Sequence, residues 1–133
     1  MLRLIIAAIV GYTLGKERKN HDKSGGSRTM ALICMGSCLV AILSLEMSTV
    51  FNFDIMRLLQ GAIQGVGFIG MGLIFKQKGQ VEGLTTASVL FFVVILGFCV
   101  GFNYFFYSFL GTIIALCVLE SKYWRVNGKI KRK

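Results

Sequence analysis

Proline is absent from this chain, histidine occurs once, and six acidic residues face fifteen lysines and arginines. The lone His21 and the scattered carboxylates supply no nucleophile with an adjacent base, so the sequence predicts no enzymatic activity and no cofactor. The four cysteines lack the Cys-x-x-Cys pairs or accompanying histidines that a structural zinc site requires. We therefore expect all four cysteines, Cys34, Cys38, Cys99 and Cys117, to be small packing residues.

Apolar sequence is abundant instead. Hydrophobic residues make up 55% of the chain and lie in long blocks separated by short charged segments. Since about 20 apolar residues cross a ~30 Å hydrocarbon core as a helix, we expect an all-α integral membrane protein, a bundle of about five transmembrane helices. The predicted spans are residues 1–16, 29–46, 57–75, 84–100 and 102–119, and a basic cytoplasmic tail covers 120–133.

The first block is the shortest and reaches spanning length only if Arg3 and Lys16 extend to the two membrane interfaces. A cleaved signal peptide is the alternative for this block. The sequence "GKER" at residues 15–18 is a poor match to the small-residue cleavage rule, so we interpret the block as a retained span.

The basic residues indicate the orientation of the bundle. With five spans, thirteen of the fifteen basic residues fall on one side, leaving Arg3 and Arg57 opposite. Cytoplasmic loops carry this excess, which predicts an external N-terminus and a cytoplasmic C-terminus. Basic residues that flank spans contact anionic lipid, and no aromatic interleaving marks a base-stacking surface. The predicted partner of this charge is the lipid bilayer and not nucleic acid.

The stretch "GVGFIGMG" at residues 65–72 contains the G-x-G-x-x-G spacing of a dinucleotide site. No alternating strand precedes it and no acidic residue follows at the required distance, so it does not predict one. On a helix, small residues permit close packing in lipid, and Gln60 and Gln64 could hydrogen-bond across such an interface. The alternative is that the glycines loosen the helix to line a cavity. The predicted packing residues are Gly61, Gly65, Gly67, Gly70 and Gly72.

Motifs along nearly the whole chain resemble the MgtC/SapB family of bacterial inner-membrane proteins. They are "GYTLGKER", "GSRT", "DIMR", "QGAIQGVGFIGMGLIF" and "VEGLTTA", in the family's order and spacing. The resemblance implies a multi-pass inner-membrane protein linked to magnesium limitation, in a family that includes virulence-associated members. Longer relatives carry a C-terminal ACT-like domain, and this chain resembles a short form without it.

Two functions are compatible with the resemblance. The first is a regulatory or interaction subunit acting on another membrane protein, and the second is a transporter of magnesium or another small solute. In the second, the glutamine- and glycine-rich third helix would line a polar path. Either role is compatible with a homo-oligomer or with a complex containing another membrane protein. We favour the regulatory role, because the spans hold few ionisable groups and show no inverted repeat.

Several polar motif residues are candidates for that role. Glu17 could pair with Arg18 or with Arg28, which stands beside Thr29, and fix the first helical hairpin, or it could bind a cation or a partner. Thr85 and Thr86 could cap the fourth helix or hold an anion at its start.

The predicted external side holds a second group of charges. Asp54 and Arg57 lie three residues apart at the start of the third span, where the carboxylate favours the helix N-terminus. A magnesium site there would need more oxygen ligands than Asp54 supplies, and Glu46 could contribute one.

Overall fold

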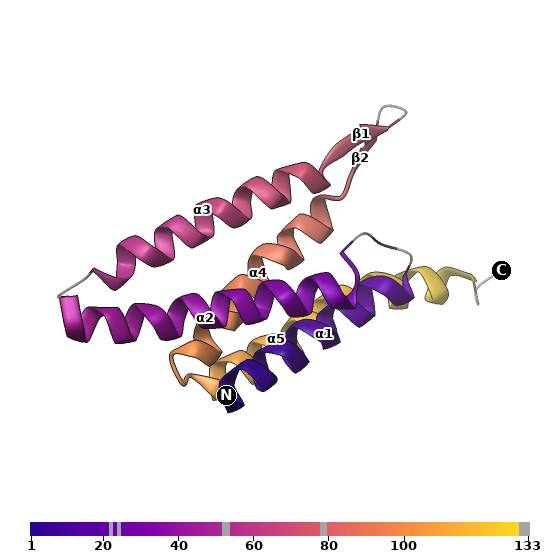
Figure 1. Cartoon of the computed structure of the whole chain (residues 1–133). Coiled ribbons are helices and arrows are strands. Elements are labelled where there is room, and N and C mark those ends of the chain that lie inside the picture. The colour runs from indigo at the N-terminus through magenta and orange to yellow at the C-terminus, as the bar shows by residue number, and fades with distance from the viewer. Residues whose placement is uncertain (22, 24, 52–53, 78–79, 131–133) are drawn as a thin grey trace.

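The computed structural model describes residues 1–21, 23, 25–51, 54–77 and 80–130 of the chain. Within them the chain forms five helices and one short hairpin, which confirms the predicted helical bundle (Figure 1). The elements are α1 (Leu2–Asn20), α2 (Ser27–Phe51), α3 (Ile55–Leu73), β1 (Phe75–Gln77), β2 (Gln80–Glu82), α4 (Leu84–Gly101) and α5 (Phe105–Ile130).

The helix ends differ from the predicted spans: α1 continues to Asn20 and α2 to Phe51, beyond the predicted ends at residues 16 and 46. Helix α5 continues to Ile130, so most of the expected tail is helical. Helix α3 ends at Leu73, and Phe75 already belongs to a strand. Charge marks where a chain can leave a membrane, but a helix continues wherever its backbone hydrogen bonds continue. The apolar blocks therefore locate the helices better than they locate the helix ends.

The antiparallel hairpin of β1 and β2 is an element that the sequence pattern did not predict. Gly83 follows β2 directly and adopts a left-handed conformation with a φ of 83°. A side chain at this position would collide with the carbonyl oxygen of Leu73. Glycine is required here for both reasons, and it brings the start of α4 against the end of α3.

Successive helices run in opposite directions, so the connections alternate between two ends of the bundle (Figure 1). We define the loop end as the last turn of α1, the first turn of α2, the hairpin and the C-terminal part of α5. The N-terminus, the end of α2 and the turn from α4 to α5 lie at the opposite end. The termini are thus on opposite sides, as an odd number of spans requires. Which side is cytoplasmic stays a prediction.

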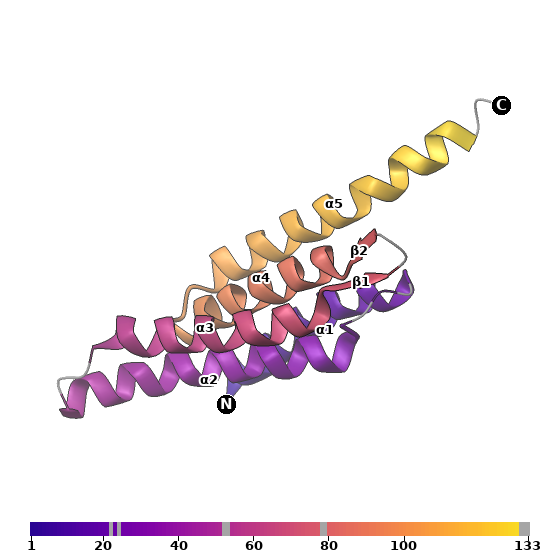
Figure 2. The same cartoon turned by 90° about the horizontal axis from the view of Figure 1, so that it is seen from above.

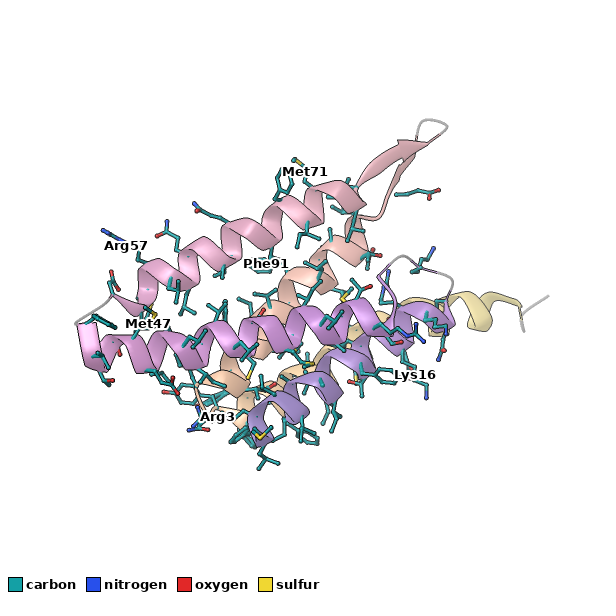
Figure 3. The ribbon with its side chains drawn as sticks, viewed as in Figure 1. Arg3, Lys16, Met47, Arg57, Met71 and Phe91 are labelled. Atoms are coloured by element: carbon teal, nitrogen blue, oxygen red, sulfur yellow. The ribbon has the colours of Figure 1, made fainter. Side chains whose placement is uncertain are left out.

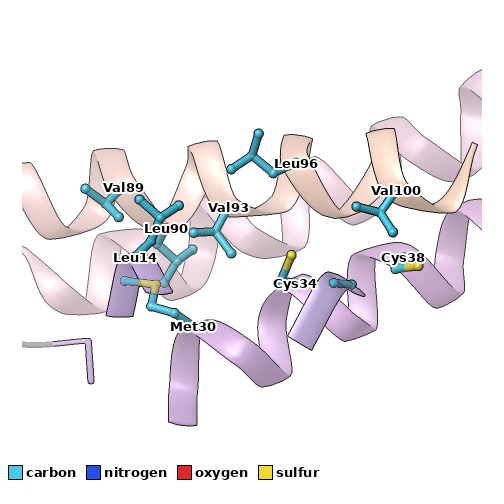
Figure 4. Close-up of a cluster of buried hydrophobic side chains, with 10 residues drawn as sticks. Leu14, Met30, Cys34, Cys38, Val89, Leu90, Val93, Leu96 and Val100 are labelled. Carbon is cyan, nitrogen blue, oxygen red and sulfur yellow. The ribbon is translucent and has the colours of Figure 1, made fainter. Parts of the chain in front are cut away.

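Helix α2 is central: it packs against α1 on one side and α4 on the other, while α3 rests on α4 and α2. Helix α5 contacts α4 and α1 and diverges from the bundle toward its C-terminus (Figure 2). The largest cluster of buried apolar side chains joins α1, α2 and α4, where Leu14, Met30, Cys34, Leu90 and Val93 meet (Figure 4). Cys34 and Cys38 are both buried in it, as predicted, whereas Cys99 is half-buried and the packing prediction is wrong for Cys117, which is exposed.

Two glycine pairs allow the close packing of this core. Gly11 and Gly15 of α1 lie against the start of α2, and a Cβ on Gly11 would stand 2.5 Å from the Met30 carbonyl oxygen. Gly97 and Gly101 of α4 lie against the middle of α2 in the same way. Both pairs have the G-x-x-x-G spacing that lets helix backbones approach in lipid. Neither pair is among the predicted packing residues, although their spacing is visible in the sequence.

The outside of the bundle fits a membrane environment. Helices α2 and α4 are long and apolar enough to cross a membrane, and α5 contains a shorter apolar stretch at Phe105–Ser121. Large apolar side chains face outward along several helices, among them Ile5, Ile9, Leu32, Phe68, Phe106 and Phe109. Since lipid replaces water around such residues, their exposure is expected for a membrane bundle.

Candidate functional site

A buried polar cluster joins α1 to α4 at the loop end. Arg18 donates a hydrogen bond from Nη2 to Oγ1 of Thr86 over 3.1 Å, and its Nη1 lies 3.7 Å from a carboxylate oxygen of Glu17. The exposed fractions of Glu17, Arg18 and Thr86 are 7%, 4% and 2%. A charged pair withdrawn from water in this way is costly unless its members are paired. The burial of this pair is therefore balanced by its contacts with each other and with Thr86.

The carboxylate of Glu17 has further capacity for interactions. His21, one turn later on the same helix, places Nε2 3.8 Å from the other carboxylate oxygen. Among the residues that the structure describes, neither oxygen of Glu17 accepts a hydrogen bond, and Nε of Arg18 finds no acceptor. Buried polar atoms are normally hydrogen-bonded. The cluster can therefore accept a water molecule or a polar group of a ligand.

The connection between α1 and α2 packs over this cluster. Gly25 has a φ of 84°, and a Cβ on it would lie 2.8 Å from Cγ2 of Thr86. Gly15 contacts the backbone of Ser27 with similar closeness. These contacts place the start of α2 beside the motif residues and shield Arg18 and Thr86 from the surroundings.

The structure decides between two predicted partners of Glu17 and corrects the predicted role of Thr86. The ion-pair partner of Glu17 is Arg18 rather than Arg28, because Arg28 and Thr29 are both exposed on the first turn of α2. Thr86 does not cap α4: the residue at the N-cap is Gly83, without a side-chain hydrogen bond, and Thr86 faces inward to Arg18. Thr85, its neighbour, is exposed.

The second predicted group of charges, at the opposite end, is exposed. Oδ1 of Asp54 accepts a hydrogen bond from the backbone N–H of Met56 over 2.9 Å and so caps α3. Glu46 and Arg57 are exposed. In the described parts of the chain, no group of three histidine, cysteine, aspartate or glutamate residues is placed to hold a metal ion. A magnesium site built on Asp54 and Glu46 therefore stays a prediction.

Helix α3 presents its glycine-rich face outward. Gly61, Gly65, Gly67 and Gly72 are exposed, and no heavy atom lies within 4 Å of where their Cβ would be. The prediction that these four pack against another helix is wrong within this chain. Only Gly70 of the predicted set is buried, with the Ala87 Cβ 3.8 Å away.

The opposite face of α3 makes its contacts with the bundle. Leu59, Ala62, Ile63 and Val66 pack toward Ala41, Val94 and Phe98. Gln60 and Gln64 are exposed with the glycines, and Arg57 and Met71 point away from the other helices (Figure 3). Burial is thus decided by the longer aliphatic side chains, which fill the space between helices, and the glycines are left on the outside.

The sequence model of the MgtC family matches residues 4–126. Among curated proteins, the chain is 35% identical to "Putative magnesium transporter YhiD" of Escherichia coli K12, across 90% of this chain and 59% of YhiD. It is 32% identical to "Protein MgtC" of Salmonella typhimurium LT2, across 96% of this chain and 55% of that protein. "Protein SapB" of Bacillus subtilis is 32% identical, across 96% of this chain and 58% of SapB. No solved structure matches the chain significantly.

Proposed function

Because the chain belongs to the MgtC family of bacterial membrane proteins, we propose that it is a regulatory subunit that binds another membrane protein under magnesium limitation. Helix α3 is the docking element in this proposal. The chain spans only 55–59% of the relatives named above. The proposal therefore concerns the membrane bundle alone.

The exposed glycine face of α3 is the observation that carries this function. Gly61, Gly65 and Gly72 lie on one face of the helix, and each leaves open space at its surface. In lipid, helices associate through van der Waals contact between small residues and through hydrogen bonds between polar side chains. Gln60 and Gln64 are exposed beside the glycines and can supply such bonds to a partner helix.

The polar cluster supports this role because it fixes the position of the first turn of α4, which lies against the end of α3. Arg18 ties α1 to Thr86 in the first turn of α4. Gly83, three residues before Thr86, lies against the end of α3. A change at Glu17 or Arg18 therefore disturbs the segment that positions the docking helix. This gives the charged motif a function without requiring a bound ion.

Transport of magnesium or another solute is the second candidate, and the name of the relative YhiD, a putative magnesium transporter, favours it. Here Gln60 and Gln64 would line a polar path. Both are exposed on the outside of this bundle, so such a path would have to form between α3 and a second chain. The two functions differ in what contacts α3: a different membrane protein in regulation, and a second copy in transport.

A glycine-to-leucine pair tests the docking helix. In a deletion strain grown at low magnesium, we expect Gly65→Leu to lose growth at normal membrane abundance, because a side chain there separates α3 from its partner. Gly36→Leu is the matched control. Gly36 is also an exposed helical glycine without a neighbour within 4 Å, but it lies on α2. Equal growth of the two variants would contradict docking through α3.

Photo-crosslinking and ion flux distinguish the two functions. A photoreactive phenylalanine analogue at Phe68, which is 73% exposed on the same face, should yield an adduct with a different protein that Gly65→Leu abolishes. The analogue at Phe109 of α5 is the control. A crosslinked dimer of this chain, together with magnesium flux into liposomes holding only the purified protein, would refute regulation and support transport.

A further inference from the structure

The turn from α4 to α5 is closed by hydrogen bonds of its own backbone. The N–H of Phe102 donates to the carbonyl oxygen of Phe98 over 2.9 Å, and the N–H of Tyr104 donates to that of Cys99 over 2.8 Å. Asn103 between them has a φ of 68°, the left-handed conformation with which helices commonly end, and its N–H also donates to the end of α4. The turn can therefore lie at a membrane boundary without an unpaired backbone donor.

A charged side chain lies at the same level as this turn. Arg3 of α1 donates a hydrogen bond from Nη1 to the carbonyl oxygen of Gly101, the last residue of α4, over 2.9 Å. Figure 3 shows Arg3 at the end of the bundle that holds the turn. A guanidinium is costly in hydrocarbon, and arginines near helix ends extend to the polar edge of the membrane. The end of α4 therefore marks a polar boundary of the bundle, opposite the loop end.

Aromatic side chains gather directly after the turn. Tyr104, Phe106 and Tyr107 are each more than half exposed. The ring centroids of Tyr104 and Tyr107 lie 5.9 Å apart in an edge-to-face arrangement, and those of Phe106 and Tyr107 lie 6.0 Å apart. We call these three residues the aromatic cluster. Its rings form one connected surface that faces outward at the polar boundary.

Small residues of α5 explain why the rings lie outside the contact with α4. Ser108 and Thr112 are buried, and the Ser108 hydroxyl donates to the carbonyl oxygen of Leu96 over 3.3 Å. A Cβ on Gly111 would stand 2.9 Å from Cδ2 of the same leucine. The contact between the two helices is therefore too close for an aromatic ring, and the cluster remains available to the surroundings.

We propose that the aromatic cluster binds the boundary between headgroups and acyl chains of the lipid bilayer, at the end opposite the loop end. Tyrosine combines an apolar ring with a hydroxyl that needs a polar partner, and it is enriched at membrane–water boundaries for this reason. The apolar stretch of α5, Phe105–Ser121, begins at the cluster and spans about 25 Å as a helix, close to the thickness of the hydrocarbon core. The cluster thus fixes the depth of α5 in the bilayer. This surface is separate from α3 and does not depend on the proposed regulatory function.

Depth-dependent fluorescence quenching tests this position. Trp124 is the only tryptophan of the chain, so Trp124→Phe gives a background in which a new tryptophan reports alone. The full chain carrying Tyr107→Trp is reconstituted into phosphatidylcholine liposomes whose acyl chains hold bromine either close to the headgroups or close to the bilayer centre. We expect stronger quenching by the shallow bromine. Ile114→Trp is the matched control, since Ile114 is 53% exposed and lies about two turns further along the same helix face. Its quenching should be stronger by the deep bromine.

A second comparison tests whether the cluster fixes the depth. Tyr104→Ala with Tyr107→Ala, in the protein carrying the Ile114→Trp probe, should change the ratio of shallow to deep quenching at the probe. Ile5→Ala with Ile9→Ala is the control, because both isoleucines are exposed on α1 and lie outside the cluster. This control should leave the ratio unchanged.

Three results would overturn the proposal. Stronger quenching of Tyr107→Trp by the deep bromine would place the cluster inside the hydrocarbon. Quenching of that probe by neither bromine, while Ile114→Trp is quenched, would show that a protein surface covers the cluster in place of lipid. A ratio at the Ile114→Trp probe that the two tyrosine substitutions leave unchanged, or that the α1 control shifts equally, would refute the role of the cluster in fixing the depth.

Discussion

The close contact of α4 with α2 predicts that alanine substitutions at two helical glycines change the stability of the protein in opposite directions. Gly97 lies so close to α2 that a Cβ would stand 2.5 Å from the carbonyl oxygen of Cys34 and 2.8 Å from Cβ of Ser37. One of these neighbours is backbone, so it cannot rotate away, and Gly97→Ala must push the helices apart. A Cβ on Gly36 would have no heavy atom within 4 Å.

The expected magnitude follows from two opposing effects. Replacing glycine by alanine inside a helix stabilises it by roughly 1 kcal/mol through backbone entropy. Inserting a methyl group into a closely packed contact costs about 1–3 kcal/mol. Gly36→Ala should therefore raise the free energy of unfolding by up to about 1 kcal/mol. Gly97→Ala should lower it by up to about 2 kcal/mol once the helix gain of about 1 kcal/mol is subtracted.

Thermal unfolding in one detergent, followed by size-exclusion chromatography, measures the difference. At roughly 4 °C per kcal/mol for a chain of this size, the two variants should differ in Tm by several degrees, with opposite signs relative to the unsubstituted protein. A Gly97→Ala protein as stable as Gly36→Ala would refute the close approach of α4 to α2. It would then also remove the reason for glycine at Gly101, which makes the same contact one turn later.

Two further predictions concern the polar cluster and the orientation. Thr86→Val removes the acceptor of the Arg18 hydrogen bond and should cost about 1.5–3 kcal/mol of stability in the same unfolding assay. Thr85→Val should be near neutral, and similar losses for both would contradict the buried bond. With the native cysteines replaced, new cysteines at Lys23 and Ile130 should react with an impermeant thiol reagent from the cytoplasmic side and one at Val50 from the outside. Labelling of Val50 and Ile130 from the same side would contradict the five-span arrangement, and labelling of each from the side opposite to that expected would contradict the orientation derived from the basic residues.

The partner of Glu17 illustrates how far sequence reasoning could go at the site. The order Glu17-Arg18 marked both residues as motif members, and the hairpin of α1 and α2 made Arg28 an equally reasonable partner. The structure pairs Glu17 with Arg18 and exposes Arg28. The deciding contact is the hydrogen bond from Arg18 to Thr86, which lies on α4, 68 residues away along the chain. No local spacing carries that information.

The sequence alone determined that the chain is an all-α membrane protein, that it has five helices and that it belongs to the MgtC family. Apolar blocks of spanning length, separated by charge, have no other stable arrangement in lipid than helices, because each backbone group must be hydrogen-bonded within its own segment. The family motifs depend only on residue order. They could therefore be recognised without knowing which helices are neighbours, and the family match over residues 4–126 agrees.

Tertiary structure alone decided which small residues face other helices. The G-x-x-x-G spacing occurs at Gly11 and Gly61 alike, and again at Gly97. In the bundle, the pairs that begin at Gly11 and Gly97 meet α2, while the pair that begins at Gly61 faces outward. The spacing makes close approach possible for every such helix, since it only removes side chains. Which faces meet depends on the connections of the chain and on the longer side chains that fill the remaining space, and this leaves the glycine face of α3 open.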